Sequence, residues 1–193
     1  MTNSLNHSPA DQYPLATELQ VSQWLNCPSP ISLAELRGKV VVIHAFQMLC
    51  PGCVSHGIPQ ASAIHQYYSH DEVQVIGLHS VFEHHQVMTS EALIAFVEEY
   101  NLTFPIAIDS PNETGPIPKT MADYQMQGTP TLIIIDKLGR LRVNAFGRPS
   151  DLQVGDLIAR LISEDYGDLS SENDVLKELA KDEAVKNEER RKE

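Results

Sequence analysis

The chain has 193 residues, with 26 aspartate and glutamate side chains against 14 lysine and arginine side chains, and a formal net charge of −12 at pH 7. A charge of this sign argues against binding to nucleic acid or to anionic membrane surfaces. No stretch reaches the roughly 18 apolar residues that a membrane-spanning helix needs, and the first residues lack the basic and apolar regions of a secretory signal. We therefore expect one folded domain in the cytoplasm, without a nucleic-acid or membrane partner.

The N-terminal third begins with a polar stretch and then becomes strongly apolar. Residues 1–20 carry Pro9 and Pro14, which interrupt regular structure, so we expect a flexible segment there. Residues 21–38 are predicted to be an extension laid over the core. Residues 40–46 (VVVIHAF) are predicted to be a strand covered on both faces, because the run is β-branched and apolar without polar alternation.

Beyond this strand, predicted helices alternate with strands. A helix begins at Pro51, a position that tolerates proline, and ends near Tyr68. The later elements are strands at 73–80 and 104–109, helices at 90–100 (capped by Ser90), within 115–127 and at 150–162, and a hairpin of 131–136 and 141–147. Residues 164–193 form a charged tail that we expect to be disordered. This order predicts an α/β three-layer sandwich with a mixed sheet, spanning residues 21–163.

The most informative motif is Cys50-Pro51-Gly52-Cys53, which follows the predicted buried strand and begins a helix. Cysteines three residues apart in the first helical turn can form a short disulfide. Free N–H groups and the partial positive charge of the helix terminus stabilise a thiolate there. Cys50 lies nearest the terminus, so we assign it as the attacking nucleophile and Cys53 as the resolving thiol. With only three cysteines in the chain, the pair is expected to be catalytic or metal-binding rather than a structural staple.

Together with this motif, the dipeptide Thr129-Pro130 before a predicted strand and the hairpin LGRLRVNAFG resemble the thioredoxin-like superfamily. The lead-in ISLAELRGKVVVIHAF and the segment TFPIAID are similar to its redoxin branch, which groups alkyl hydroperoxide reductase and thiol-specific antioxidant proteins. The resemblance implies a thioredoxin-like fold with an N-terminal extension and a central insertion. It also implies that Pro130 is a cis-proline facing the disulfide and that Thr129 offers backbone bonds to a substrate.

The residues around the cysteines depart from the patterns of related proteins. Thioredoxin-like reductants usually carry tryptophan before the first cysteine and Gly-Pro between the two, where this chain has Leu49 and Pro51-Gly52. The changed dipeptide leaves the reduction potential open. Peroxiredoxins similar to this branch carry threonine or serine three residues before the peroxidatic cysteine and proline seven before, where this chain has Gln47 and Ile43. These departures weaken the interpretation as a fast peroxidase.

His44 stands six residues before Cys50, where thioredoxins commonly have a buried aspartate that helps to move the proton of the second cysteine. A histidine there can act as a general base for Cys53, because its unperturbed pKa of about 6.5 is close to working pH. The alternative is a core histidine bonded to a backbone carbonyl group.

Histidines are concentrated between residues 40 and 118, a span that contains every histidine except His7 and no lysine or arginine. Any lowering of the Cys50 pKa then depends on the helix terminus and on His56. The candidate metal ligands are Cys50, Cys53, His56, His79, His84 and His85. Thiolate and imidazole suit copper or zinc, but Cys-x-x-Cys fits zinc only beside a second, well-spaced pair of ligands, so we assign no metal.

We predict a thiol–disulfide oxidoreductase in which Cys50 attacks a disulfide, Cys53 resolves the mixed disulfide, and Thr129 and Pro130 align the substrate. No cofactor is needed, since the partners are a protein or small-molecule disulfide and an upstream dithiol reductant. The alternatives are a peroxide reductase that forms a sulfenic acid at Cys50, a copper- or zinc-binding or delivery module, and a redox sensor.

Two further groups have less specific interpretations. Cys27 is predicted to be a small buried hydrophobe. Arg140 and Arg142 alternate onto one face of a hairpin strand and, with Arg148, form the compact basic group of the folded part. We expect Arg140 and Arg142 on a solvated edge.

Overall fold

Six strands form one mixed sheet in the computed structural model, which describes residues 13–165. The strands are β1 (Val21–Leu25), β2 (Val40–Phe46), β3 (Val73–His79), β4 (Ile106–Asp109), β5 (Thr131–Ile135) and β6 (Leu141–Phe146). Their spatial order is β1-β4-β3-β2-β5-β6. β2 pairs in parallel with β3 and antiparallel with β5, so it lies in the interior of the sheet. The predicted mixed sheet is confirmed.

The strand β2 is buried along its whole length because both faces of the sheet are covered. Alternate residues point to opposite faces: Val40, Val42 and Phe46 belong to the core beneath α1, α2 and α4, whereas Val41, Ile43 and Ala45 belong to the core on the other side. Residues 40–46 thus lack polar alternation because both faces of the strand are covered, as the sequence predicts.

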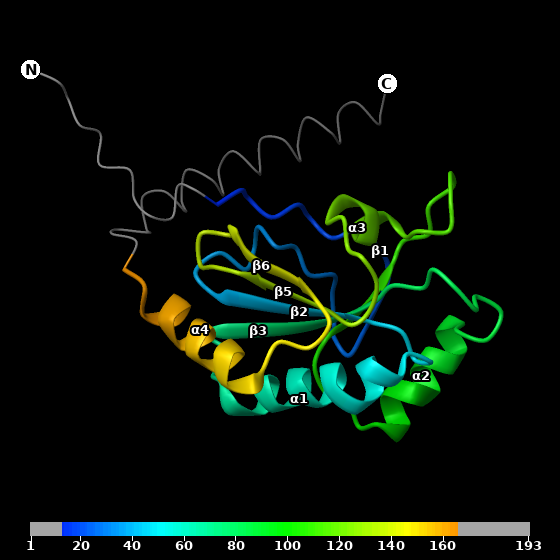
Figure 1. Ribbon diagram of the computed structural model, residues 1–193, viewed down its shortest axis with the longest axis horizontal. Helices are drawn as coiled ribbons and strands as arrows, with labels where there is room; N and C mark the ends of the chain where they lie inside the picture. Colours follow the sequence, from blue (N-terminus) through cyan, green and yellow to red (C-terminus); the bar gives the residue numbers. More distant parts are fainter. Residues whose placement is uncertain (1–12, 166–193) are drawn as a thin grey trace, which may run out of the picture.

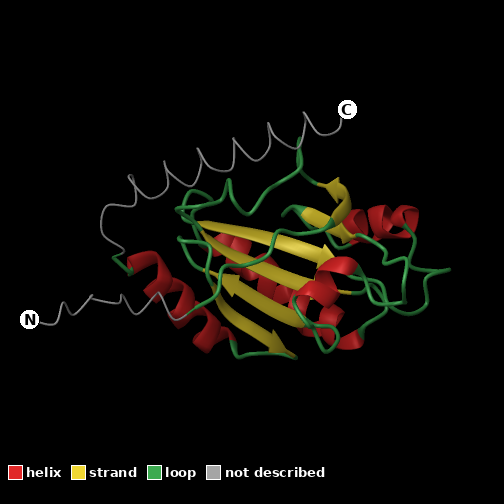
Figure 2. Cartoon of the chain, turned by 90° about the horizontal axis from the view of Figure 1, so that it is seen from above, coloured by secondary structure: helices red, strands yellow, loops and turns green. Residues whose placement is uncertain are grey.

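The helices α1 (Ile58–Tyr67), α2 (Ser90–Glu99) and α4 (Asp151–Ser163) lie on one side of the sheet, as Figures 1 and 2 show. The short helix α3 (Lys119–Asp123) lies on the opposite side, where the extension before β2 also packs. This arrangement confirms the predicted α/β/α layering. Within residues 13–165, no helix has both the length and the apolar character needed to span a membrane.

Two local predictions about caps and extensions need revision. Thr89, and not Ser90, caps α2, since the Thr89 side chain accepts a hydrogen bond from the backbone N–H of Ala92. The extension also contains a true strand, because β1 pairs antiparallel with β4 at the edge of the sheet.

The segment before β1 is bonded to the hairpin between β5 and β6. Leu141 N–H donates to the carbonyl oxygen of Pro14 over 2.9 Å, and Ala16 N–H donates to Gly139 over 2.9 Å. Flexibility is expected for residues 1–20, and it stays a prediction for residues 1–12, which lie outside the described residues. Residues 166–193 of the predicted tail also lie outside them.

The prediction that Arg142 lies on a solvated edge is wrong. Its side chain is only 13% exposed and lies 3.1 Å from Asp136 Oδ2 and 2.6 Å from Glu164 Oε2. The guanidinium group also lies 4.5 Å from the centre of the Tyr13 ring. Arg142 therefore ties the hairpin to both ends of the described chain.

Candidate active site

Cys50 and Cys53 form a disulfide at the point where β2 leads into a helical run. The run begins at Pro51, as predicted, but residues Cys53–Gly57 form a π-helical turn, η2, before α1. The Cys50 carbonyl accepts from Val54 N–H, so Cys50 occupies the N-cap position. Its Sγ accepts from the N–H of Cys53 over 3.2 Å. A donor in this place stabilises negative charge on the Cys50 sulfur once the disulfide is opened.

The two sulfurs differ in access. Cys53 is fully buried, whereas Cys50 is partly exposed and packs at the border of the core. Leu49, directly before Cys50, is exposed to 59%. A partner molecule can therefore reach the first sulfur but not the second.

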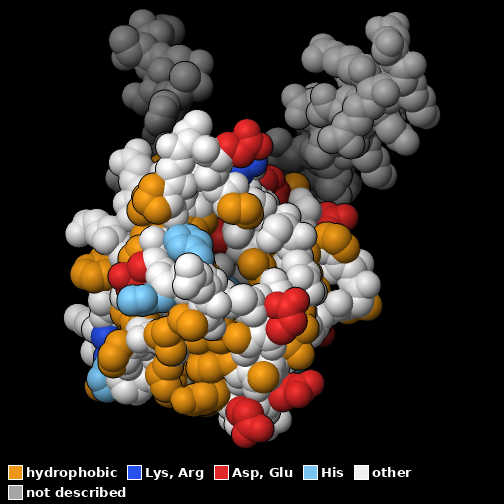
Figure 3. Space-filling model, turned by 90° about the vertical axis from the view of Figure 1, so that its right-hand side faces the viewer, with side chains coloured by type: hydrophobic (Ala, Val, Ile, Leu, Met, Phe, Trp, Pro, Cys, Tyr) orange, Lys and Arg blue, Asp and Glu red, His pale blue; other side chains and the backbone are white. Residues whose placement is uncertain are grey.

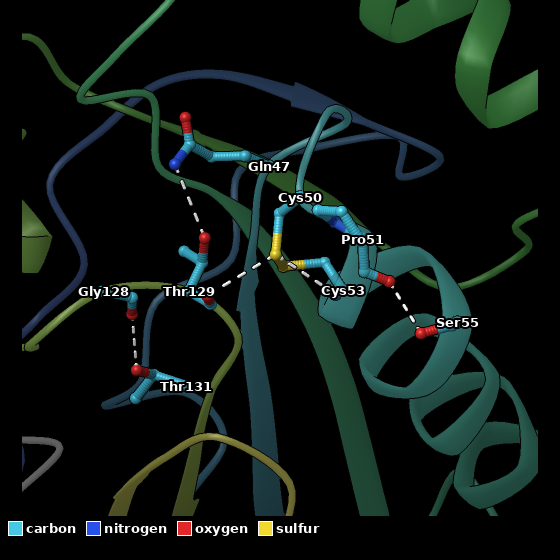
Figure 4. Close-up of a disulfide and its surroundings, with 8 residues drawn as sticks. All are labelled: Gln47, Cys50, Pro51, Cys53, Ser55, Gly128, Thr129 and Thr131. Carbon is cyan, nitrogen blue, oxygen red and sulfur yellow. Dashed lines mark hydrogen bonds between the residues drawn. A yellow bond between two sulfur atoms is a disulfide. The ribbon is translucent and has the colours of Figure 1, made fainter.

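The loop of residues 128–130, which we call the proline loop, precedes β5 and lies against the disulfide. It lies there because β5 runs antiparallel to β2. Ala45 pairs with Thr131, so the residues preceding Thr131 continue past the end of β2 toward Cys50. The Thr129–Pro130 peptide bond is cis, which confirms the prediction for Pro130. The carbonyl oxygen of Thr129 lies 3.4 Å from Cys50 Sγ, and Thr131 Oγ1, at the start of β5, donates to the carbonyl oxygen of Gly128, as Figure 4 shows.

Two glycines allow Pro130 to approach the helical run closely. A Cβ atom on Gly52 would lie 3.3 Å from Pro130 Cδ, and one on Gly57 would lie 3.3 Å from Pro130 Cβ. Contacts this short force the neighbour to shift, so side chains here would push the proline loop away from the disulfide. Gly52 of the cysteine motif thus has a packing role.

His44 lies beneath the π-helical turn, on the same side of β2 as α1. Its Nε2 lies 3.1 Å from Gln60 Oε1, so the partner is a side chain and not the backbone carbonyl group of the alternative interpretation. Nδ1 is buried, lies 3.4 Å from the place of a Cβ on Gly57, and has no hydrogen-bond partner among residues 13–165. Burial lowers the pKa of His44 to about 4, against the opposing effect of the Gln60 hydrogen bond, so the ring is neutral at pH 7.

Gln60 connects His44 to charged residues at the start of α4, a connection that the sequence did not reveal. Its Nε2 donates to Asp151 Oδ1 over 2.6 Å and to the Pro149 carbonyl oxygen over 3.0 Å. Asp151 Oδ2 lies 3.6 Å from Arg148 Nη2, and Arg148 Nη1 lies 3.1 Å from His56 Nδ1. Folding thus brings an arginine to a helical turn whose own stretch of sequence contains none.

Gln47, three residues before Cys50, is buried and points toward the proline loop (Figure 4). Its Nε2 donates to Thr129 Oγ1 over 3.5 Å, and its Oε1 has no partner among residues 13–165. The Gln47 amide, at the sequence position where the resemblance to peroxiredoxins implies a hydroxyl group, thus contacts Thr129.

The candidate metal ligands do not gather into one site. His79 is buried at the end of β3, His84 and His85 are exposed on the following loop, and His56 bonds Arg148. Nowhere in the described part of the chain do three or more histidine, cysteine, aspartate or glutamate side chains form a metal-binding group. His79 and His85 instead line a cavity of about 420 Å³ beside the N-terminus of α2.

The end of the molecule that carries the disulfide exposes apolar and histidine side chains but few basic ones (Figure 3). Leu49 and Phe146 are among the large apolar residues exposed in the described chain. Cys27 is a free, partly exposed cysteine two residues after β1 rather than a buried hydrophobe, and desolvation raises its pKa. Such a thiol is a poor nucleophile at neutral pH.

Comparisons with known proteins agree with this geometry. The model of the AhpC/TSA family matches residues 15–144. A crystal structure of a thiol-disulfide isomerase from Corynebacterium glutamicum is 52% identical, with a TM-score of 0.77, and the match covers 80% of this chain and 99% of that one. The thiol-disulfide oxidoreductase ResA of Bacillus cereus is 27% identical over 124 residues, 64% of each chain. NHL repeat-containing protein 2 of Gallus gallus is 32% identical over 128 residues, 65% of this chain but only 16% of that protein.

Proposed function

Because the chain belongs to the AhpC/TSA family and its domain is an oxidoreductase, we propose that it exchanges thiols and disulfides through Cys50 and Cys53. The observation that carries the proposal is the disulfide itself, with one accessible sulfur at a helix N-terminus and one buried sulfur, beside a cis-proline loop. The C. glutamicum isomerase, which is similar over nearly its whole length, supports the same chemistry.

In the first step, the Cys50 thiolate attacks one sulfur of a substrate disulfide. A mixed disulfide forms at Cys50, and the other substrate sulfur leaves as a thiolate that takes a proton from water. The N–H of Cys53 stabilises the thiolate before attack, since it already donates to Cys50 Sγ. Thr129 and Pro130 align the substrate backbone beside the reacting sulfur, because this loop contacts Cys50 directly.

In the second step, the Cys53 thiol loses its proton and attacks Cys50 Sγ. The mixed disulfide breaks, the Cys50–Cys53 disulfide forms, and the second substrate thiolate leaves, so that the substrate gains two electrons and the protein loses two. We assign His44 to accept the Cys53 proton at Nδ1, which lies beneath the helical turn without a partner in residues 13–165. Burial lowers the pKa of His44 to about 4 and so makes the resting imidazole a weaker base than a free histidine. An upstream dithiol then reduces the protein, and we place this cycle in the cytoplasm.

Single cysteine variants test the two roles. With a peptide disulfide as substrate, Cys50→Ser is expected to abolish exchange, whereas Cys53→Ser is expected to accumulate a mixed disulfide at Cys50 that mass spectrometry detects. Cys27→Ser is the matched control and should retain wild-type turnover. Full multiple turnover by Cys53→Ser would overturn the two-cysteine mechanism.

Peroxide reduction is the second candidate, favoured by the family match and opposed by Gln47, which stands three residues before Cys50 and bonds Thr129. Stopped-flow mixing of the reduced protein with hydrogen peroxide separates the two functions. We expect Cys50 to react at a rate similar to that of free cysteine. A rate constant orders of magnitude higher would assign the protein to the peroxidases.

A further inference from the structure

We propose that Gln60 and Asp151 are positioning residues that hold His44 in the one tautomer able to take the proton of Cys53. The inference deepens the proposed function and depends on it, since it concerns the second step of exchange at the same cysteines. Hydrogen bonds from His44 to Gln60 and from Gln60 to Asp151 join β2, α1 and α4 beneath the disulfide.

The orientation of the Gln60 amide is fixed by its two acceptors. Its Nε2 lies 2.6 Å from Asp151 Oδ1 and 3.0 Å from the Pro149 carbonyl oxygen, and neither of these oxygens can donate a hydrogen. The amide nitrogen must therefore face α4, and Oε1 must face His44. Gln60 is buried, so no competing solvent contact turns the amide around.

The amide orientation determines the tautomer of His44. Because Gln60 Oε1 can only accept, the imidazole Nε2 at 3.1 Å must carry the hydrogen. Nδ1 then holds a lone pair, and it faces Gly57, the last residue of the π-helical turn that begins at Cys53. In the other tautomer, Nδ1 would already carry a hydrogen and could not accept the Cys53 proton.

Asp151 strengthens the hydrogen bond between Gln60 and His44 when His44 takes the proton of Cys53. Its carboxylate polarises the Gln60 amide through the 2.6 Å hydrogen bond, which makes Oε1 a better acceptor for the Nε2–H of an imidazolium ion. Burial keeps His44 uncharged at rest, and the neutral amide of Gln60 separates the ring from the Asp151 carboxylate. The other charged or titratable groups on this chain of contacts are Arg148, which pairs with Asp151, and His56 of η2.

The two steps of exchange can be measured separately in one stopped-flow experiment. Reduced protein is mixed with a peptide disulfide that carries a fluorophore and a quencher on its two halves. The first phase reports formation of the mixed disulfide by Cys50, and the second reports its resolution by Cys53. The variants are Gln60→Met and Asp151→Asn, with Gln66→Met on an exposed site of α1 and Asp156→Asn on α4 as matched controls.

We expect the first phase to be the same in all proteins. The second phase should slow about tenfold or more in Gln60→Met and severalfold in Asp151→Asn, since general-base catalysis typically contributes at least a hundredfold. Nitrogen-15 NMR of the reduced wild type should show the hydrogen of His44 on Nε2, and Gln60→Met should populate the other tautomer. A merely structural role for Gln60 would leave this signature unchanged.

The outcomes separate this inference from the proposed function. Absence of the first phase in the wild type would overturn thiol–disulfide exchange itself. A normal first phase with a Gln60→Met second phase equal to that of Gln66→Met would overturn only the positioning role. If Gln60→Met does not fold, Asp151→Asn decides, because resolution as fast as in Asp156→Asn contradicts the inference.

Discussion

The two ends of the sheet differ in whether their buried polar atoms have hydrogen-bond partners. At the hairpin end, the buried carboxylate of Asp136 accepts from Leu138 N–H, Arg140 N–H and Arg142 Nη1 at 2.9 to 3.1 Å. At the disulfide end, His44 Nδ1, Gln47 Oε1 and His79 Nε2 are buried without a hydrogen-bond partner among residues 13–165.

This difference indicates how the molecule divides stability and reactivity. An unpaired buried polar atom costs about 1–3 kcal/mol, and such atoms are few in native proteins. Three of the four such atoms among residues 13–165 lie at the disulfide end, and the fourth is His65 Nδ1 in the last turn of α1. Together with the complete pairing at Asp136, this distribution indicates that the hairpin end stabilises the fold while the disulfide end keeps atoms available for chemistry. Substitutions at the two ends should therefore affect different measurements.

The largest expected effect on stability is at the hairpin end. Asp136→Ala removes an acceptor of three hydrogen bonds and leaves the mostly buried Arg142 with one carboxylate partner fewer. We expect the free energy of unfolding in urea to fall by about 3–5 kcal/mol, with the exchange rate of the folded protein unchanged. Asp156→Ala, which removes an exposed partner of Arg160, is the control and should cost less than about 1 kcal/mol. Equal losses in the two variants would contradict the division.

The next effect is a pH dependence that originates at the disulfide end. Burial lowers the pKa of both His44 and His79 to about 4, so the unfolded state, with a pKa near 6.5, binds more protons between these values. The stability that each contributes is fully present above pH 6.5 and is lost as the pH falls toward 4, by on the order of 3 kcal/mol per histidine.

Urea unfolding between pH 7 and pH 5 measures this dependence. His79→Gln should lose less stability on acidification than the wild type, whereas His84→Gln, at an exposed site, should match it. Asp109 titrates with the opposite sign, because burial raises its pKa, but it is present in every variant. A wild-type pH dependence in His79→Gln would show that His79 does not carry the effect.

Substitution of Gln47 should affect stability less and the rate of exchange more. Gln47→Leu removes a buried carbonyl oxygen without a partner in residues 13–165 and one long hydrogen bond to Thr129. We expect the free energy of unfolding to change by less than about 1 kcal/mol. Exchange should slow severalfold, because Thr129 would be held less firmly beside Cys50. A large loss of stability at unchanged rate would reverse the assignment of this end to reactivity.

The predicted parts of the fold and site share a local origin. The strand at residues 40–46 follows from its apolar run, and the helix start follows from Pro51, because each depends on neighbours in sequence. The cysteine pair was likewise visible as a motif, whereas the cis bond at Pro130 came from family resemblance alone.

The missed parts depend on contacts between distant residues. Gln60 meets Asp151 across 91 positions, and Arg148 meets His56 across 92. One signal was available: Gln60 lies on the same helical face as Ala61 and Ile64, and a polar residue on a buried face requires a partner. Which partner that would be depended on how α4 packs, and no local pattern specifies that.

The smallest expected effect on stability is at Arg148, at the disulfide end of the sheet. Arg148 brings positive charge beside the π-helical turn through its contact with His56, yet its side chain is 46% exposed. Arg148→Met should therefore cost less than about 1 kcal/mol of stability. It should slow exchange with an acidic peptide disulfide a fewfold more than exchange with a neutral one, and high salt should remove the difference. Arg160→Met, an exposed arginine of α4, is the control. If both variants respond alike to substrate charge, only the net charge of the protein matters, whereas a response confined to Arg148 identifies it as the residue that steers acidic substrates toward Cys50.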